Sequence, residues 1–177
     1  MSAAAPLSTI GLVGLAVMGQ NLALNIASKG FGISVWNRSH EKTVATVARA
    51  KEEKVEGELR GFEQITEFVQ SLQKPRAVII LVQAGKPVDA IIAQLSGLME
   101  PGDLIIDGGN EWYTNTQRRG VELKEKNLLY MGMGVSGGEV RSAPHTQQRT
   151  LSSVRRSINS LRCPCDFFLF VFACCFL

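Results

Sequence analysis

Cysteine is absent from the first 162 of the 177 residues, so disulfide bonds cannot stabilise that part of the chain. Histidine occurs only twice, and no apolar run reaches the ~20 residues that a membrane-spanning helix needs. These absences exclude a disulfide-rich secreted domain and favour a reducing compartment. What remains, 45% hydrophobic and 20% charged residues, is typical of a globular protein.

The basic excess of the chain lies in one segment. Residues 1–139 carry 14 Lys and Arg against 15 Asp and Glu, whereas residues 140–177 carry five Arg and one Asp. The net charge of +3 is therefore not spread over a folded basic surface, and we expect no nucleic-acid partner. The change in composition predicts a domain over residues 1–139 and a tail, residues 140–177, that is not a domain.

The two ends of the chain bear on its location. Residues 1–8 lack the pattern of a secretory signal, so we expect a cytosolic protein. The apolar run 167–177 is too short to cross a bilayer, and we expect no membrane association. Three interpretations of the cysteines in the tail stay open: prenylation of Cys174 within a C-a-a-X signal, a zinc site, or no function. Because their spacing differs from that of common zinc sites, we expect no metal.

Short apolar runs alternate with amphipathic segments along the first 131 residues. The runs typical of strands are 9–13, 33–36, 77–82, 104–106 and 128–131. The segments typical of helices are 22–27, 39–48, 63–72, 87–98 and 113–126, the last a charged surface helix, and residues 51–61 read as a solvated connection. Helical crossovers between strands produce parallel pairing covered on both faces. The pattern predicts an α/β fold, a Rossmann-like doubly wound parallel sheet.

Particular side chains are expected to pack within this fold. Val44, Val47 and Ala48 recur at the spacing of one helix face, which we expect to be buried. Trp36 and Trp112 are expected to pack rather than to bind a ligand.

A glycine-rich turn follows the first predicted strand. It consists of Gly14, Leu15, Ala16, Val17, Met18 and Gly19. In such a turn Gly14 permits the tight bend, Ala16 lets the backbone approach a pyrophosphate, and Gly19 lets the helix pack on the strand. The helix N-terminus presents N–H groups to the anion. The turn indicates a dinucleotide site; the alternative is a packing turn without a ligand.

The second predicted strand ends without the acidic residue that usually holds the ribose hydroxyls of NAD. Asn37, Arg38 and Ser39 follow it instead. A guanidinium pairs with a 2′-phosphate, which a carboxylate would repel. These residues favour NADP over NAD as the cofactor. The alternative is that Arg38 is a solvated loop residue and Ser39 only caps the next helix.

Three later strands also end in polar, glycine-containing turns. These turns contain Val82, Gln83 and Ala84, then Asp107 to Asn110, and finally Ser136, Gly137 and Gly138. Ligands of open α/β sheets bind beyond the carboxyl ends of the strands. The Asn110 amide and the Ser136 hydroxyl can supply oriented hydrogen bonds, whereas Asp107 is expected only to fix its loop. Ordinary turns use the same residue types, so the prediction depends on their joint position beside the glycine turn.

Five stretches of the sequence are distinctive: GLAVMGQNLALNIASKGF, VWNRS, LVQAG, IIDGGNEWYTNTQRR and GMGVSGGE. From about Ser8 to Glu139 they closely resemble the N-terminal domain of the 6-phosphogluconate dehydrogenase family. The resemblance implies a homodimeric enzyme of the pentose phosphate pathway. Such an enzyme oxidises 6-phosphogluconate with NADP and decarboxylates the product to ribulose 5-phosphate.

The resemblance also implies a role for each loop. Residues 14–19 would hold the dinucleotide, and residues 37–39 the 2′-phosphate end. Residues 82–84 would line the nicotinamide side, Asn110 would contact both cofactor and substrate, and residues 136–138 would bind the sugar acid. Two positions depart from the family pattern, because Ser39 replaces a more usual Thr and Gln83 a common Lys.

After Glu139 the sequence no longer resembles the family. The family's general base, a Lys, and its general acid, a Glu, lie beyond this point, and residues 140–177 contain neither residue type. We therefore expect no catalytic residue in this chain. We also expect it to lack the C-terminal helical domain, which in the family completes the substrate pocket and the dimer.

Three functions follow from these observations. The first is the family's oxidoreductase activity, with this chain supplying the cofactor-binding part and turning over substrate poorly by itself. The second is a non-catalytic module that binds NADP or pairs with a full-length subunit. The third is a membrane-associated form tethered through Cys174.

Overall fold

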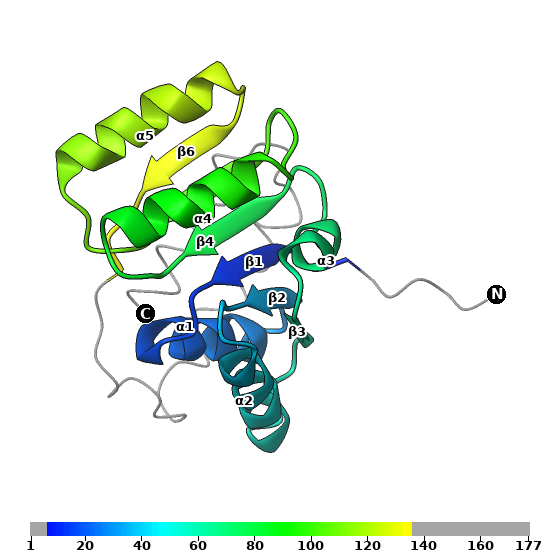
Figure 1. The fold of residues 1–177 in the computed structure, drawn as a ribbon. Helices are drawn as coiled ribbons and strands as arrows, with labels where there is room; N and C mark the ends of the chain where they lie inside the picture. The colour runs from blue at the N-terminus through cyan, green and yellow to red at the C-terminus, as the bar shows by residue number, and fades with distance from the viewer. Residues whose placement is uncertain (1–6, 136–177) are drawn as a thin grey trace, which may run out of the picture. The chain divides into compact units, whose positions relative to one another are not determined.

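The computed structural model describes residues 7–135, which form a six-stranded parallel sheet with five helices (Figure 1). The strands are β1 (Ile10–Val13), β2 (Ile33–Trp36), β3 (Leu59–Phe62), β4 (Ala77–Ile80), β5 (Leu104–Asp107) and β6 (Leu129–Gly132). The helices are α1 (Val17–Ser28), α2 (His40–Glu52), α3 (Ile65–Gln70), α4 (Lys86–Ser96) and α5 (Tyr113–Glu125). The strand order β3-β2-β1-β4-β5-β6 confirms the Rossmann-like doubly wound sheet.

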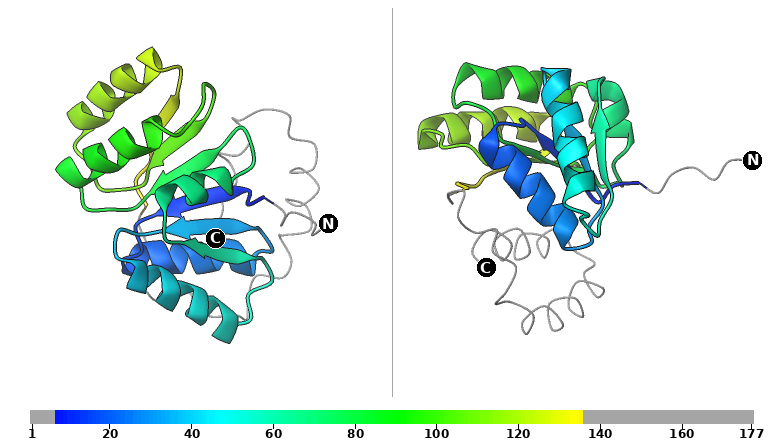
Figure 2. Two further views of the ribbon diagram at one scale, coloured as in Figure 1. Left: turned by 45° about the vertical axis from the view of Figure 1, so that its right-hand side comes forward. Right: turned by 90° about the horizontal axis from the view of Figure 1, so that it is seen from below.

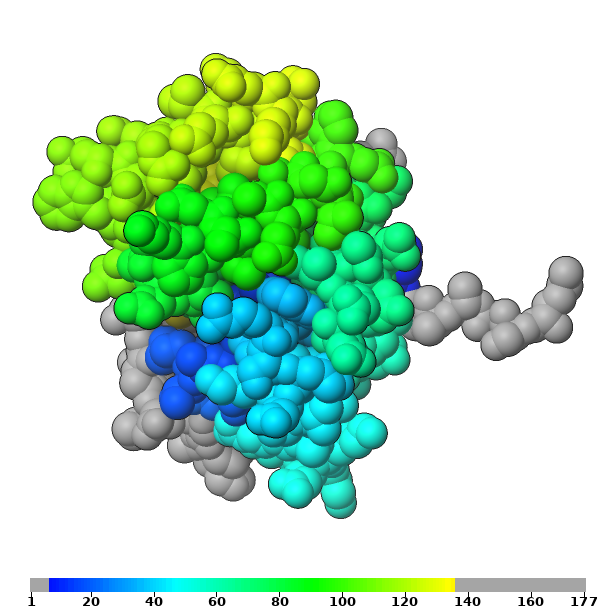
Figure 3. All heavy atoms as spheres, viewed as in Figure 1, coloured from blue at the N-terminus to red at the C-terminus, as the bar shows by residue number. Residues whose placement is uncertain are grey.

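Helices cover both faces of this sheet. Successive side chains of a strand point to opposite faces, so Val78 and Ile80 of β4 share one face. That face packs against α3, α4 and α5 through Phe68, Leu95 and Leu123. Figure 2 shows α1 on the other side of the strands, and in Figure 3 the spheres of α4 lie between those of α5 and α3. Because all the strands are parallel, the loops that follow them gather at one edge of the sheet, the carboxyl edge.

Two expectations about the segment from α2 to β3 are wrong. Residues 59–62 form β3 instead of a solvated connection, paired in parallel with β2. The strand has little apolar signal because it lies at the sheet edge, and backbone hydrogen bonds hold it there. In α2 the buried positions are Thr43, Thr46 and Ala50, whereas Val44 is 54% exposed. The β-branched threonines therefore form the packed face that was expected of the valines.

The two tryptophans differ from each other. Trp36 is buried, as expected, and its indole N–H donates to the Glu63 carbonyl at 3.0 Å. Trp112 is 65% exposed, so it does not pack as expected. It stands directly before α5, where its ring lies beside that of Tyr113 with centroids 5.2 Å apart.

Candidate functional site at the carboxyl edge of the sheet

The glycine-rich turn joins β1 to α1 at the carboxyl edge. Gly14 has a φ of +100°, a conformation that favours glycine, and a Cβ there would overlap the Leu81 carbonyl oxygen. A Cβ on Gly19 would overlap the carbonyl oxygen of Gly14. The tight bend and the close approach of helix to turn therefore both depend on glycine, as the sequence predicts.

The start of α1 has no side chain that caps it. Its N-cap residue is Ala16, which makes no capping hydrogen bond and is among the residues least favoured at that position. Ala16 and Val17 are both exposed. The first N–H groups of a helix have no partner within the helix, and an anion can satisfy them. The local chemistry therefore suits a phosphate group in front of α1.

Asn37 connects the glycine turn to the loop after β2. Its Oδ1 accepts the Leu15 N–H at 3.0 Å, and its Nδ2 donates to the Ser39 carbonyl at 3.1 Å. Ser39 is the N-cap residue of α2, but its hydroxyl makes no capping hydrogen bond. Arg38 is exposed, and its guanidinium has no hydrogen bond or ion pair within residues 7–135. The Arg38 guanidinium and the Ser39 hydroxyl are therefore exposed beside the glycine turn, where they can contact a ligand.

The loops after β4 and β5 adjoin the same turn. Gly14 lies against Leu81 and Val82, and Gly108 donates its N–H to the Ile80 carbonyl at 2.9 Å. A Cβ on Gly109 would lie 3.5 Å from the Val82 carbonyl oxygen. The glycine turn therefore packs against residues 81–82, and residues 81–82 pack against residues 108–109. These contacts lie between β1 and β4, where the strand order reverses.

Most of the predicted contact residues in these two loops are accessible to solvent. Gln83, Ala84 and Asn110 are exposed, and Val82 is half-buried. Asp107 is buried, and its Oδ1 accepts the Gly109 N–H at 3.1 Å, which confirms that it fixes its loop. Ser136, Gly137 and Gly138 lie outside the described residues.

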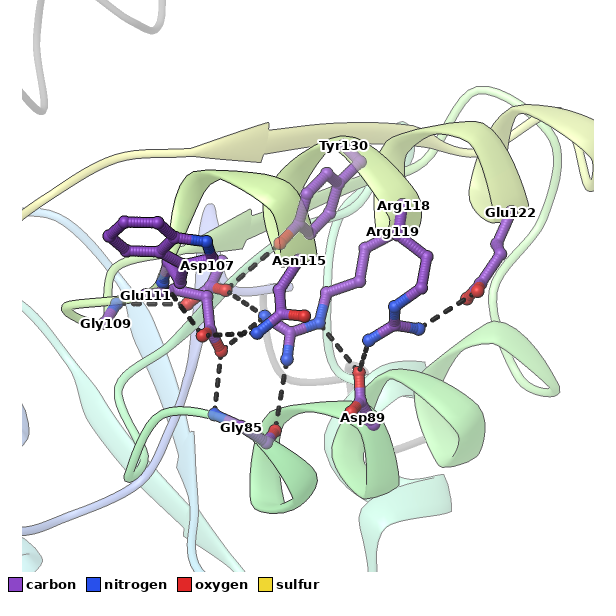
Figure 4. A network of polar contacts seen from close by, with 11 residues as sticks. Gly85, Asp89, Asp107, Gly109, Glu111, Asn115, Arg118, Arg119, Glu122 and Tyr130 are labelled. Atoms are coloured by element: carbon purple, nitrogen blue, oxygen red, sulfur yellow. Dashed lines mark hydrogen bonds and ion pairs between the residues drawn. The ribbon is translucent and has the colours of Figure 1, made fainter.

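Sequence reasoning missed a charged cluster behind these loops (Figure 4). Its centre is Arg119 of α5, which is 1% exposed although the helix was expected to be a charged surface helix. The guanidinium forms ion pairs with Asp89 at 2.8 Å, Asp107 at 3.1 Å and Glu111 at 2.7 Å. It also donates to the Gly85 carbonyl at 3.1 Å. The only sequence signal is Leu123, four positions later on the same helix face and also buried.

Hydrogen bonds stabilise the charged form of Glu111. Its Oε1 accepts from Asn115 Nδ2 at 2.9 Å, and its Oε2 accepts the Gly85 N–H at 2.7 Å. These two bonds, the Asn115 bond first, lower the pKa of Glu111 to about 2 against the opposing effect of burial. Burial also opposes the charge of Arg119, but its hydrogen bonds with Asp89 and Glu111 outweigh it and raise the pKa of Arg119.

Within residues 7–135, no group of three or more His, Cys, Asp or Glu side chains is arranged to hold a metal ion. Over the same residues, the structure contains no helix of the length and apolarity that crossing a membrane requires.

The sheet order, the glycine turn and the gathered loops define a Rossmann-type domain, a class that binds dinucleotides. Residues 9–151 match the family described as the NAD binding domain of 6-phosphogluconate dehydrogenase, and the chain belongs to that family. It is 63% identical over 137 residues to the decarboxylating 6-phosphogluconate dehydrogenase 1 of Spinacia oleracea, which covers 76% of this chain and 28% of the relative.

Two further relatives agree with this assignment. The chloroplastic decarboxylating 6-phosphogluconate dehydrogenase 3 of Arabidopsis thaliana is 64% identical over 135 residues, 75% of this chain and 27% of that protein. A solved structure of Plasmodium falciparum 6-phosphogluconate dehydrogenase, described in its apo form and with NADP+ and 6-phosphogluconate, is 54% identical with a TM-score of 0.70. That match covers 74% of this chain and 28% of the other. The chain thus spans little more than a quarter of the length of the relatives it matches.

Proposed function

We propose that residues 7–135 bind NADP. The observation that supports this most is the uncapped start of α1 behind the φ +100° turn at Gly14, with the exposed Arg38 beside it. The helix terminus and turn suit the pyrophosphate, and Arg38 with Ser39 suits the 2′-phosphate. NADP, when bound, accepts a hydride. The chain's own residues orient it, with residues 82–84 and Asn110 lining the nicotinamide side.

We infer that the substrate is 6-phosphogluconate, oxidised and decarboxylated to ribulose 5-phosphate as the family membership implies. Asn110 would contact substrate as well as cofactor, and Ser136, Gly137 and Gly138 would bind the sugar acid. No residue of this chain is assigned as general base or general acid. The chain therefore contributes the cofactor-binding part of the reaction, and its pairing with a complete subunit is the alternative role.

Two expectations remain predictions alongside this function. The domain of residues 1–139 and the tail of residues 140–177 are proposed as the functional division of the chain. The cytosolic location also remains a prediction, because the relatives include proteins named as chloroplastic.

The test is NADPH binding and turnover on one preparation of the 177-residue chain. Calorimetry should record saturable heat with NADPH. A spectrophotometric assay with NADP+ and 6-phosphogluconate should record little NADPH formation, because general acid–base groups contribute roughly 10²–10⁴-fold each. A folded chain that releases no heat with NADPH would refute the proposal.

A further inference from the structure

Arg119 and Glu111 together bind both backbone groups of Gly85, at the end of the loop after β4. Arg119 Nη2 donates to the Gly85 carbonyl at 3.1 Å, and Glu111 Oε2 accepts the Gly85 N–H at 2.7 Å. The two side chains are themselves paired at 2.7 Å. Gly85 also has a φ of +88°. A shift of this end of the loop would therefore break the hydrogen bonds of Gly85 to both side chains.

The same guanidinium reaches the loop after β5. Arg119 Nη1 donates to Asp107 Oδ2 at 3.1 Å, and the Tyr130 hydroxyl donates to the same oxygen at 3.0 Å. The other oxygen of Asp107 accepts the Gly109 N–H. Arg119 thus connects to both loops, one from each neighbouring strand. Figure 4 shows Gly109 at the left of this cluster and Gly85 below it.

A buried cluster of charges such as this one adds little to the stability of a fold. Removing a guanidinium and carboxylates from water costs free energy that their attraction does not always recover, and apolar replacements are often equally stable. Its value lies in geometry, because a planar guanidinium with several donors fixes the directions of its partners. Loops that are already in place lose less conformational entropy when a ligand binds.

We propose that Arg119 is a positioning residue that sets the loop at residues 82–85 against the loop at residues 107–110, and so favours binding of the nicotinamide half of the cofactor. This inference rests on the proposed NADP function. The adenosine half is assigned to the glycine turn and Arg38, to which the Arg119 cluster makes no hydrogen bond within residues 7–135. Loss of a positioning role would therefore lower affinity only for ligands that carry the nicotinamide half, whereas general damage to the fold would lower affinity for both halves.

The test compares NADP+ with adenosine 2′,5′-bisphosphate, which carries the 2′-phosphate but no nicotinamide. Arg119→Lys retains the charge near Asp107 but lacks the planar set of donors. We expect it to lower the affinity for NADP+ by about tenfold, the effect of one charged hydrogen bond. The affinity for adenosine 2′,5′-bisphosphate should change by less than about twofold. Glu111→Ala, which removes the acceptor of the Gly85 N–H, should give the same pattern and decides the matter if Arg119→Lys does not fold.

Arg118→Lys is the matched control. Arg118 precedes Arg119 on the same helix and shares Asp89 as a partner, but its contacts are with Asp89 and Glu122 and with neither loop. It should leave both affinities unchanged. Equal losses for the two ligands in a folded Arg119→Lys or Glu111→Ala chain, or no loss, would overturn the positioning role alone. An unaltered chain that binds neither ligand would overturn the proposed function and this inference together.

Discussion

The side-chain oxygen of Asn37 accepts the backbone N–H of Leu15 at 3.0 Å, across 22 positions of sequence. The same amide donates to the Ser39 carbonyl, so one side chain fixes the glycine turn against the loop that carries Arg38. Together with the Gly14 N–H bond to the Trp36 carbonyl at 3.1 Å, Asn37 therefore holds the proposed pyrophosphate and 2′-phosphate subsites in place relative to each other. The sequence groups Asn37 with Arg38 and Ser39 as residues that favour NADP, and its hydrogen bonds to Leu15 and Ser39 support that prediction.

Asn37→Asp should shift preference from NADPH toward NADH. The aspartate still accepts the Leu15 N–H, but it cannot donate to Ser39 and it places a negative charge beside the 2′-phosphate subsite. We expect the ratio of NADPH to NADH affinities to fall about tenfold or more, measured by calorimetry. Asn37→Ala, which removes the anchor without adding charge, should weaken both cofactors. An unchanged ratio in Asn37→Asp would contradict this account.

Arg38→Ala should lower the affinity for NADPH much more than the affinity for NADH. Losing a charge-assisted hydrogen bond costs about 1.5–3 kcal/mol, which corresponds to a loss of roughly 10–150-fold for NADPH. NADH lacks the 2′-phosphate and should be affected less than about twofold. Lys51→Ala, at the far end of α2, removes the same charge and serves as the control. Losses of equal size for both cofactors would rule out a 2′-phosphate contact.

Gly19→Ala should destabilise the domain and abolish NADPH binding. The added Cβ would overlap the Gly14 carbonyl oxygen, so α1 must move away from the turn. We expect the free energy of unfolding to fall by about 1–3 kcal/mol, measured by urea denaturation. Gly120→Ala is the control, because its Cβ would meet only Tyr130 Cδ1 at an ordinary 3.7 Å within α5. Alanine there should stabilise the helix by about 0.5–1 kcal/mol. A Gly19→Ala chain as stable as the unaltered one would contradict the close packing.

Glu111 should make stability depend on pH in acid. Its pKa of about 2 in the folded chain lies below the ordinary value of 4.5, so the charged form stabilises the fold above pH 4.5. That contribution is lost as the pH falls from 4.5 through about 2. In urea titrations over this range, Glu111→Gln should lose less free energy of unfolding than the unaltered chain. Parallel decreases in both chains would show that the Glu111 carboxylate makes no such contribution.

The carboxyl edge of the sheet could be predicted from sequence because its signals are local. An apolar strand, a Gly14-to-Gly19 turn and an amphipathic helix each follow from neighbouring residues, and parallel crossovers bring every strand end to the same edge. β3 was missed for the converse reason. Its burial is low, and it exists through backbone pairing with β2, which no periodicity within residues 59–62 indicates.

The sequence by itself determined the alternation of strands and helices apart from β3, the dinucleotide turn and the family of this protein, since each depends on residues close together in the chain. Only the tertiary structure decided which of two adjacent arginines is buried. Arg118 and Arg119 are chemically identical, but Arg119 faces the sheet and meets Asp89 and Gly85, 30 and 34 positions away. Burial of a charge depends on counter-charges from distant elements, and it is the packing of α5 on β6 and α4 that brings them together.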